Sequence, residues 1–205
     1  MRTIRNVFDF FSSIYRTRLR MENRQLIAAC KKQDTNAQRE LYEMYAPRML
    51  GLCLRYSKDY DAAQDMLHDG FLKVLTQIKT YSGRGSFEGW MRRIFINTVF
   101  EHFREEKKKY LTLSEVDESE EIEVVDENFE RLFNDNITEE HLLEMIQEMP
   151  PGYRTVFSLY VFEDMPHKEI AKKLGIKENA SRSQYSRAKS FLRNKINGYY
   201  ANNNE

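Results

Sequence analysis

MPHKEIAKKLG, Met165–Gly175, and IKENASRSQYSRAKSFLRNK, Ile176–Lys195, are the two adjacent segments that decide the fold. In the first segment apolar residues recur on one helical face, and Gly175 suits the left-handed conformation that ends a helix. The second segment has an apolar stripe and an opposite face rich in Arg, Ser, Gln and Lys. The pattern predicts a helix-turn-helix whose second helix can enter a DNA major groove. An ordinary helical hairpin with a solvated basic face would have the same pattern.

Charge is unevenly distributed along the 205 residues, although the formal net charge is zero. Residues 114–140 contain twelve acidic side chains and one basic one, whereas the blocks on either side are mildly basic. Basic blocks attract phosphate backbones and an acidic block is repelled by them. The simplest interpretation is one or two domains with a solvated acidic tether, which needs no partner of its own.

The rest of the chain is helical in pattern, and no useful length alternates as a strand does. Thr35 and Gln38 have capping-box spacing, Pro47 predicts a kink in a long helix, and Ser86 is a good N-cap. The helices expected besides the hairpin are 22–33, 36–56, 61–80, 87–108, 138–149 and 153–163. The sequence therefore predicts an all-α fold of two small bundles.

Cys30 and Cys53 do not form a CxxC pattern, and neither has a His nearby at ligand spacing. They are therefore predicted to be buried thiols in a reducing compartment. The apolar run near the N-terminus is interrupted by Asp9 and is too short for a signal peptide or a membrane span. We expect a soluble, cytoplasmic protein. No motif points to a metal or a cofactor.

Three blocks in order resemble an extracytoplasmic-function (ECF, group 4) sigma factor of the sigma-70 class. AAQDMLHDGFLKVL resembles the family's core-polymerase-binding helix, and GSFEGWMRRIFINTVFEHFR resembles the helix that melts and reads the −10 element. MPPGYRTVFSLYVFEDMPHKEIAKKLGI followed by SRSQYSRAK resembles the domain that reads the −35 element. One block alone would be weak evidence, but three in register with an acidic linker are a specific signal.

The resemblance implies five segments in the chain. They are a basic N-terminal extension at 1–21, a sigma-2-like domain at 22–110, a flexible acidic linker at 111–136, a sigma-4-like helix-turn-helix domain at 137–197, and a tail at 198–205. The extension is expected to be a weakly ordered tail, with a docking element for an extra partner as the alternative.

For the polymerase-binding helix, the resemblance implies contacts to the β′ subunit from one helical face. The implied residues are Asp65, His68, Asp69 and Lys73. A solvated helix surface is the alternative. Gly70 lies within this helix, where it weakens helical propensity by about 1 kcal/mol relative to Ala and lets a partner backbone approach closely.

For the −10 element, the resemblance implies a glycine-containing loop at 82–86 that holds an unstacked base and a helix that neutralises phosphates. The implied contacts are Arg84, Ser86, Arg92, Arg93 and Asn97. Trp90 is spaced with its apolar neighbours as a core residue, which we prefer to a role as a stacking platform.

For the −35 element, the resemblance places the DNA contacts on the second helix of the hairpin. They are Lys177, Arg182, Ser183, Gln184, Ser186, Arg187 and Lys189. Ser181 occupies a position that is usually apolar, which predicts weaker folding or altered specificity. Lys177 is unfavourable at a helix N-terminus unless a phosphate lies there.

The leading hypothesis is a non-enzymatic sigma factor that recruits core RNA polymerase through its β and β′ subunits, recognises −35 and −10 promoter DNA and helps to melt the −10 duplex. An anti-sigma factor or an accessory recruiting protein is a further expected partner. One alternative is a helix-turn-helix regulator without affinity for polymerase. Another is a metal-dependent enzyme using Asp65, His68 and Asp69, although these groups fit a protein interface better.

Overall fold

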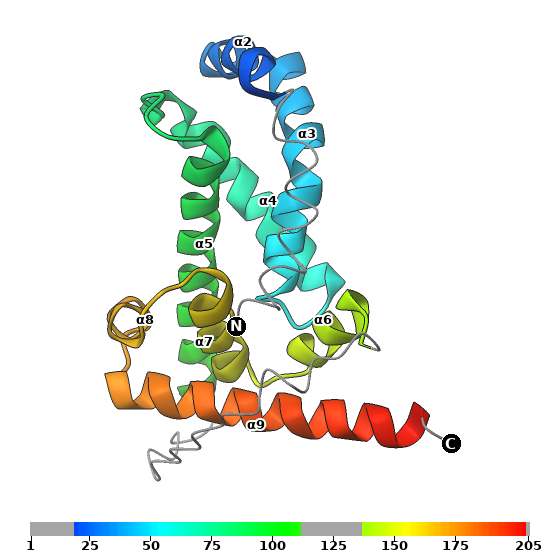
Figure 1. The fold of residues 1–205 in the computed structure, drawn as a ribbon. Coiled ribbons are helices and arrows are strands. Elements are labelled where there is room, and N and C mark those ends of the chain that lie inside the picture. Colours follow the sequence, from blue (N-terminus) through cyan, green and yellow to red (C-terminus); the bar gives the residue numbers. More distant parts are fainter. Residues whose placement is uncertain (1–18, 112–136, 204–205) are drawn as a thin grey trace.

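The computed structural model describes residues 19–111 and 137–203, and the regular structure in these two ranges is helical (Figure 1). The first bundle comprises α2 (Leu19–Lys31), α3 (Thr35–Leu54), α4 (Tyr60–Gln77) with the short 3-10 helix η1 (Ile78–Thr80), and α5 (Phe87–Leu111). The second bundle comprises α6 (Glu139–Gln147), α7 (Pro151–Phe162), α8 (His167–Leu174) and α9 (Glu178–Asn203). The prediction of an all-α chain is confirmed. The expectations for residues 1–18, and for residues 112–136 of the linker predicted at 111–136, lie outside the described residues, while Leu111 is the last residue of α5.

Polar side chains fix where the helices begin. Asp34 caps α3, because its carboxylate accepts a hydrogen bond of 2.9 Å from the Ala37 amide. The prediction of a cap at Thr35 was therefore wrong by one residue, since the neighbouring carboxylate satisfies the free amide instead. The helix assignment continues through Pro47 to Leu54.

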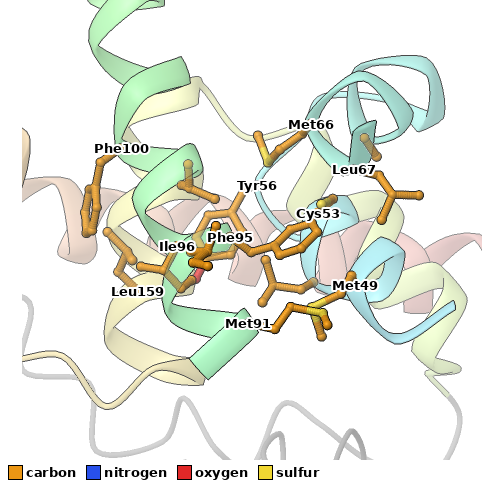
Figure 2. Packing of buried hydrophobic residues seen from close by; sticks show 14 of the residues in the cluster. Met49, Cys53, Tyr56, Met66, Leu67, Met91, Phe95, Ile96, Phe100 and Leu159 are labelled. Atoms are coloured by element: carbon orange, nitrogen blue, oxygen red, sulfur yellow. The ribbon is translucent and has the colours of Figure 1, made fainter. Parts of the chain in front are cut away.

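The core of the first bundle forms where α5 packs against α3 and α4. Met91 and Phe95 are fully buried there, near Met49 and Cys53 of α3 (Figure 2). A side chain at Gly70 of α4 would overlap with the ring of Phe95. The close approach allowed by this glycine is therefore used within the bundle, rather than by a partner.

The second bundle is built on α7 and α9, with α8 packed across them. Pro151 occupies the first turn of α7, where its missing amide would have had no partner in any case. Gly175 ends α8 in the left-handed conformation at φ 66°, and α9 begins at Glu178 after a short turn. The predicted helix-turn-helix is confirmed.

The two bundles pack against one another, so that α5 is buried on a second face. Ile96 and Phe100 on that face are 7% and 3% exposed, and they share a buried cluster with Leu159 of α7 (Figure 2). The helical periodicity of α5 predicted one apolar stripe and left these two residues out of it. Their burial comes from a distant part of the chain, which the local pattern does not report.

Candidate protein and nucleic-acid interfaces

The exposed face of α4 brings together the residues predicted to bind polymerase. Asp65, His68 and Asp69 are exposed, and Asp69 contacts the ring of His102 of α5 at 2.9 Å. Lys73 lies at the border of this face, where it pairs with Glu101 of α5 and donates to the Thr98 hydroxyl at 3.2 Å. The face is thus a mixed-charge surface tied at one edge to α5.

Leu72 lies on the same face of α4, and sequence reasoning missed it. Its side chain is 64% exposed, which is unusual for a leucine among charged neighbours in the middle of a helix. The signal was present, because Leu72 follows His68 and Asp69 by four and three residues and falls outside the apolar stripe of the helix. We refer to Asp65, His68, Asp69 and Leu72 as the α4 face.

The loop before α5 is held in a defined shape. Gly83 and Gly85 adopt φ values of 81° and 78°, which a residue with a side chain adopts only with strain. The Tyr81 hydroxyl donates to the Gly85 carbonyl at 2.9 Å, and the Ser86 hydroxyl accepts from the Gly89 amide at 3.1 Å. The predicted cap at Ser86 is confirmed. Arg84 is exposed between the two glycines.

An aromatic cluster supports the base of this loop. The ring centroids of Tyr81, Phe87 and Trp90 are separated by 5.1 to 5.5 Å. Trp90 is half-buried against the core, which agrees with its interpretation as a packing residue. Lys31 of α2 donates to the Tyr81 carbonyl at 2.6 Å and so ties the cluster to the start of the bundle.

The candidate −10 residues of α5 divide between two faces. Arg93 and Asn97 are exposed one helical turn apart, where a ligand could reach both. Arg92 instead points to the second bundle and donates two hydrogen bonds to Glu163, from Nε at 2.8 Å and from Nη2 at 2.6 Å. The Glu163 side chain is only 10% exposed and that of Arg92 is 37% exposed.

Tyr56, at the end of α3, completes this contact. Its hydroxyl donates to the Glu163 carboxylate at 3.4 Å. Burial, and after it the neighbouring carboxylate, hold the Tyr56 pKa well above its ordinary value. The phenol therefore stays protonated at neutral pH and remains a donor.

The predicted −35 residues of α9 differ in exposure. Lys177 and Arg182 are exposed, and Arg182 forms an ion pair of 2.7 Å with Glu178 one turn earlier. Ser183, Arg187 and Lys189 are half-buried, and Lys189 lies over the Tyr185 ring at 5.2 Å from its centroid.

Two of the predicted −35 contacts have a polar atom that is buried without a partner. Ser186 is 8% exposed, and its hydroxyl has no hydrogen-bond partner. The amide oxygen of Gln184 is also buried without a partner, beside Gly152 at the start of α7. A contact from Ser186 to DNA would need a change in its surroundings, whereas Gln184 is only half-buried.

A contact with His167 explains why a serine, Ser181, occupies a hairpin position that is usually apolar. The Ser181 hydroxyl, fully buried, lies 3.0 Å from Nδ1 of His167, which stacks on Tyr160 at 4.5 Å between ring centroids. Ser181 is therefore part of a satisfied polar contact, which offsets the cost expected of a buried hydroxyl. Burial and the nearby Arg182 lower the pKa of His167. Sequence reasoning missed this residue because nothing local places it against α9.

Two further features concern metal binding and membrane insertion. Among residues 19–111 and 137–203, no three side chains of His, Cys, Asp or Glu are grouped closely enough to hold a metal ion. Within the same ranges, the helices lack the combined length and apolar character needed to cross a bilayer.

Comparisons with known proteins agree with this geometry. Residues 41–109 match the family described as Sigma-70 region 2, and residues 139–192 match Sigma-70, region 4. The chain is 27% identical over 155 residues to the ECF RNA polymerase sigma factor SigE of Mycolicibacterium smegmatis, a match that covers 75% of this chain and 59% of that relative. It is 26% identical to the RNA polymerase sigma-H factor of Pseudomonas aeruginosa, over 83% of this chain and 92% of the relative.

Among solved structures, the chain aligns with the sigma factor RpoE of Bartonella quintana in its co-crystal structure with the anti-sigma factor NepR. The alignment has a TM-score of 0.45 and 14% identity, and it covers 78% of this chain and 96% of the other.

The fold, the order of the two matched regions and the similarity to sigma factors define a sigma-70 class protein. The chain belongs to the extracytoplasmic-function group of that class and is a transcription-initiation factor.

Proposed function

We propose that this chain directs core RNA polymerase to promoters by dividing the work among three helices. The α4 face binds the polymerase, the loop at 82–86 and the exposed part of α5 bind the −10 element, and α9 binds the −35 element. The chain acts by binding, and polymerase carries out the chemistry.

The exposed Leu72 within the α4 face is the observation that carries the polymerase assignment. A large apolar side chain surrounded by charged residues resembles the centre and rim of a protein interface. A solvated helix would gain only helix propensity from leucine there. Burying it against a partner helix stabilises the complex by about 1.5–3 kcal/mol.

The −10 assignment is supported by the rigid loop and the basic face that follows it. Arg84 and Arg93 are exposed and can neutralise phosphates, while the Asn97 amide can hydrogen-bond to a base edge. Gly83 and Gly85 carry no side chain, and the space where one would begin is open at both positions, which leaves room for an extruded base beside the loop backbone.

The −35 assignment is supported by the position of the cations along α9. Arg182 is exposed one turn into the helix, and its present partner Glu178 is itself on the surface. Such an exposed pair is weak and can be exchanged for a phosphate or a guanine edge. Lys177, at the helix N-terminus, adds positive charge where an anion is favoured.

A binding titration with purified core polymerase tests the proposal. We expect Asp65→Lys combined with Asp69→Lys, and separately Leu72→Ser, to weaken binding at least tenfold. Glu140→Lys, an exposed charge reversal on α6, is the matched control and should bind as the parent chain does. Full affinity in both α4 variants would refute the assigned surface.

A further inference from the structure

We propose that Glu163 acts as an internal substitute for DNA phosphate, holding Arg92 and keeping α5 partly covered until promoter DNA displaces it. This inference rests on the proposed role of α5 in binding the −10 element. It adds a specific intramolecular competitor for one of the residues that would contact DNA.

The geometry of the Arg92–Glu163 contact is that of a carboxylate replacing a phosphate. The two nitrogens Nε and Nη2 each donate to a different oxygen of Glu163, at 2.8 and 2.6 Å. A planar guanidinium binds phosphate through the same fork. Nη2 also donates to the Phe162 carbonyl at 3.4 Å, so both of these nitrogens are bound to the second bundle.

The contact is one part of a continuous stripe along α5. Arg92, Ile96, Phe100 and Arg104 follow one another at four-residue intervals, which places them on one helical face. At the far end, Arg104 donates to the Lys173 carbonyl of α8 at 2.8 Å. Any ligand approaching this face meets the second bundle first.

The end of α3 strengthens the same arrangement. The last carbonyls of a helix have no partner within the helix. Those of residues 54–56 accept hydrogen bonds from the second bundle, donated by Gln147 (3.2 Å), Ser158 (2.9 Å) and Arg154 (3.1 Å). Three side chains from α6 and α7 therefore hold one short stretch of the first bundle in register.

The composition of this contact suits it to opening. Besides the apolar packing of Ile96 and Phe100, it consists of hydrogen bonds to backbone carbonyls, whose donors water can replace, and of one ion pair, in which phosphate can replace the carboxylate. Arg154 would keep its bonds to the Gln147 and Met149 carbonyls, at 2.7 and 3.1 Å, after separation. Each bundle also has fully buried residues of its own, such as Phe95 in the first and Phe157 in the second.

A distance measurement in the free chain tests the contact itself. Spin labels are attached at Lys79→Cys and Lys172→Cys, two exposed positions on different bundles, while the native cysteines are buried and react poorly. We compare the parent chain with Glu163→Gln, and with the control Glu169→Gln, an exposed residue of α8. We expect Glu163→Gln to lengthen and broaden the distance distribution and the control to leave it unchanged. An unchanged distribution in Glu163→Gln would overturn the contact.

Binding of DNA by the same variants tests the competition. The probe is a fluorescein-labelled single strand spanning the −10 region of a promoter located by transcript mapping, used without polymerase. Glu163→Gln should bind it about fivefold more tightly, and adding Arg92→Ala should remove the gain. A changed distance with unchanged affinity would overturn the competition, while the polymerase titration above tests the proposed function separately.

Discussion

The helices α5 and α9 are nearly equal in length, yet they are buried in different ways. α9 presents one buried stripe to α7 and α8, formed by Ser181, Tyr185, Ala188, Leu192 and Ile196. α5 has one buried face within its own bundle and a second against the other bundle, so that more of its circumference is covered.

This difference indicates which DNA-binding helix depends on the arrangement of the bundles. Lys177, just before α9, and Arg182, within it, are already exposed, whereas Arg92 on α5 is engaged by Glu163. A change in the contact between the bundles would therefore alter access to α5 before it alters access to α9.

The largest expected effect separates the two buried faces of α5. Phe95→Ala removes a ring that is fully buried in the first bundle and should lower the free energy of unfolding by about 3–5 kcal/mol. Phe100→Ala, on the face between bundles, should instead separate the bundles while the first bundle melts near its usual temperature. Calorimetry combined with the spin-label distance distinguishes these outcomes. If Phe95→Ala and Phe100→Ala lower the melting temperature equally, the two buried faces of α5 belong to a single core.

The next effect concerns Gly70, which Phe95 contacts. Ala at this position gains about 1 kcal/mol of helix propensity but overlaps with the ring, and overpacking costs about 1–3 kcal/mol. We expect Gly70→Ala to be net destabilising in urea unfolding, whereas Gly198→Ala in α9, where the space is open, should stabilise. A stabilised Gly70→Ala variant would mean that the helices move apart at little cost.

Two arginines in ion pairs provide a smaller contrast. Arg92→Ala leaves a carboxylate that is 10% exposed without its partner and should cost about 1–2 kcal/mol. Arg182→Ala breaks an exposed pair within one helix and should cost about 0.3–0.5 kcal/mol. Chemical denaturation measures both. Similar costs would show that the contact between bundles is as weak as a surface pair.

The smallest effect is a pH dependence confined to the second bundle. His167 faces Ser181, Tyr160 and Tyr185, with Arg182 and Glu178 nearby, and its pKa in the folded chain is below the ordinary 6.5. The unfolded chain therefore binds the proton more readily, so that stability falls as the pH drops from 6.5 toward the folded pKa.

Melting curves of the second bundle at several pH values check this sign. His167→Gln should flatten the dependence, and His68→Gln, an exposed residue of the first bundle, should retain it. If the melting temperature of His167→Gln still changes with pH as in the parent chain, another group causes the pH dependence.

The helices and their order followed from the sequence because capping residues, glycines and apolar spacing act locally. Ser86 begins a helix and Gly175 ends one as predicted. Asp34 takes the cap expected at Thr35, α7 begins at Pro151 rather than at 153, and α9 continues past Lys195 to Asn203. Three of the four residues of the α4 face were predicted, and Leu72 was missed because only polar and charged residues were considered as contacts there.

The contact between the bundles could not be predicted from local patterns. Glu163 is 71 residues from Arg92 in sequence, and a charged residue at the end of a helix is ordinarily interpreted as solvated. Likewise, Ser181 was expected to weaken its helix. Its partner, His167, is on another helix, so the local pattern could not show that the hydroxyl is satisfied.

Sequencing of transcript 5′ ends tests the central claim most directly, namely that this chain directs core polymerase to promoters through separate polymerase-binding and DNA-binding surfaces. Core polymerase, genomic DNA and the chain should give defined start sites. These should disappear with Asp65→Lys and Asp69→Lys together, and also with Arg182→Ala and Arg187→Ala together. Start sites that persist unchanged in both variants would contradict the account.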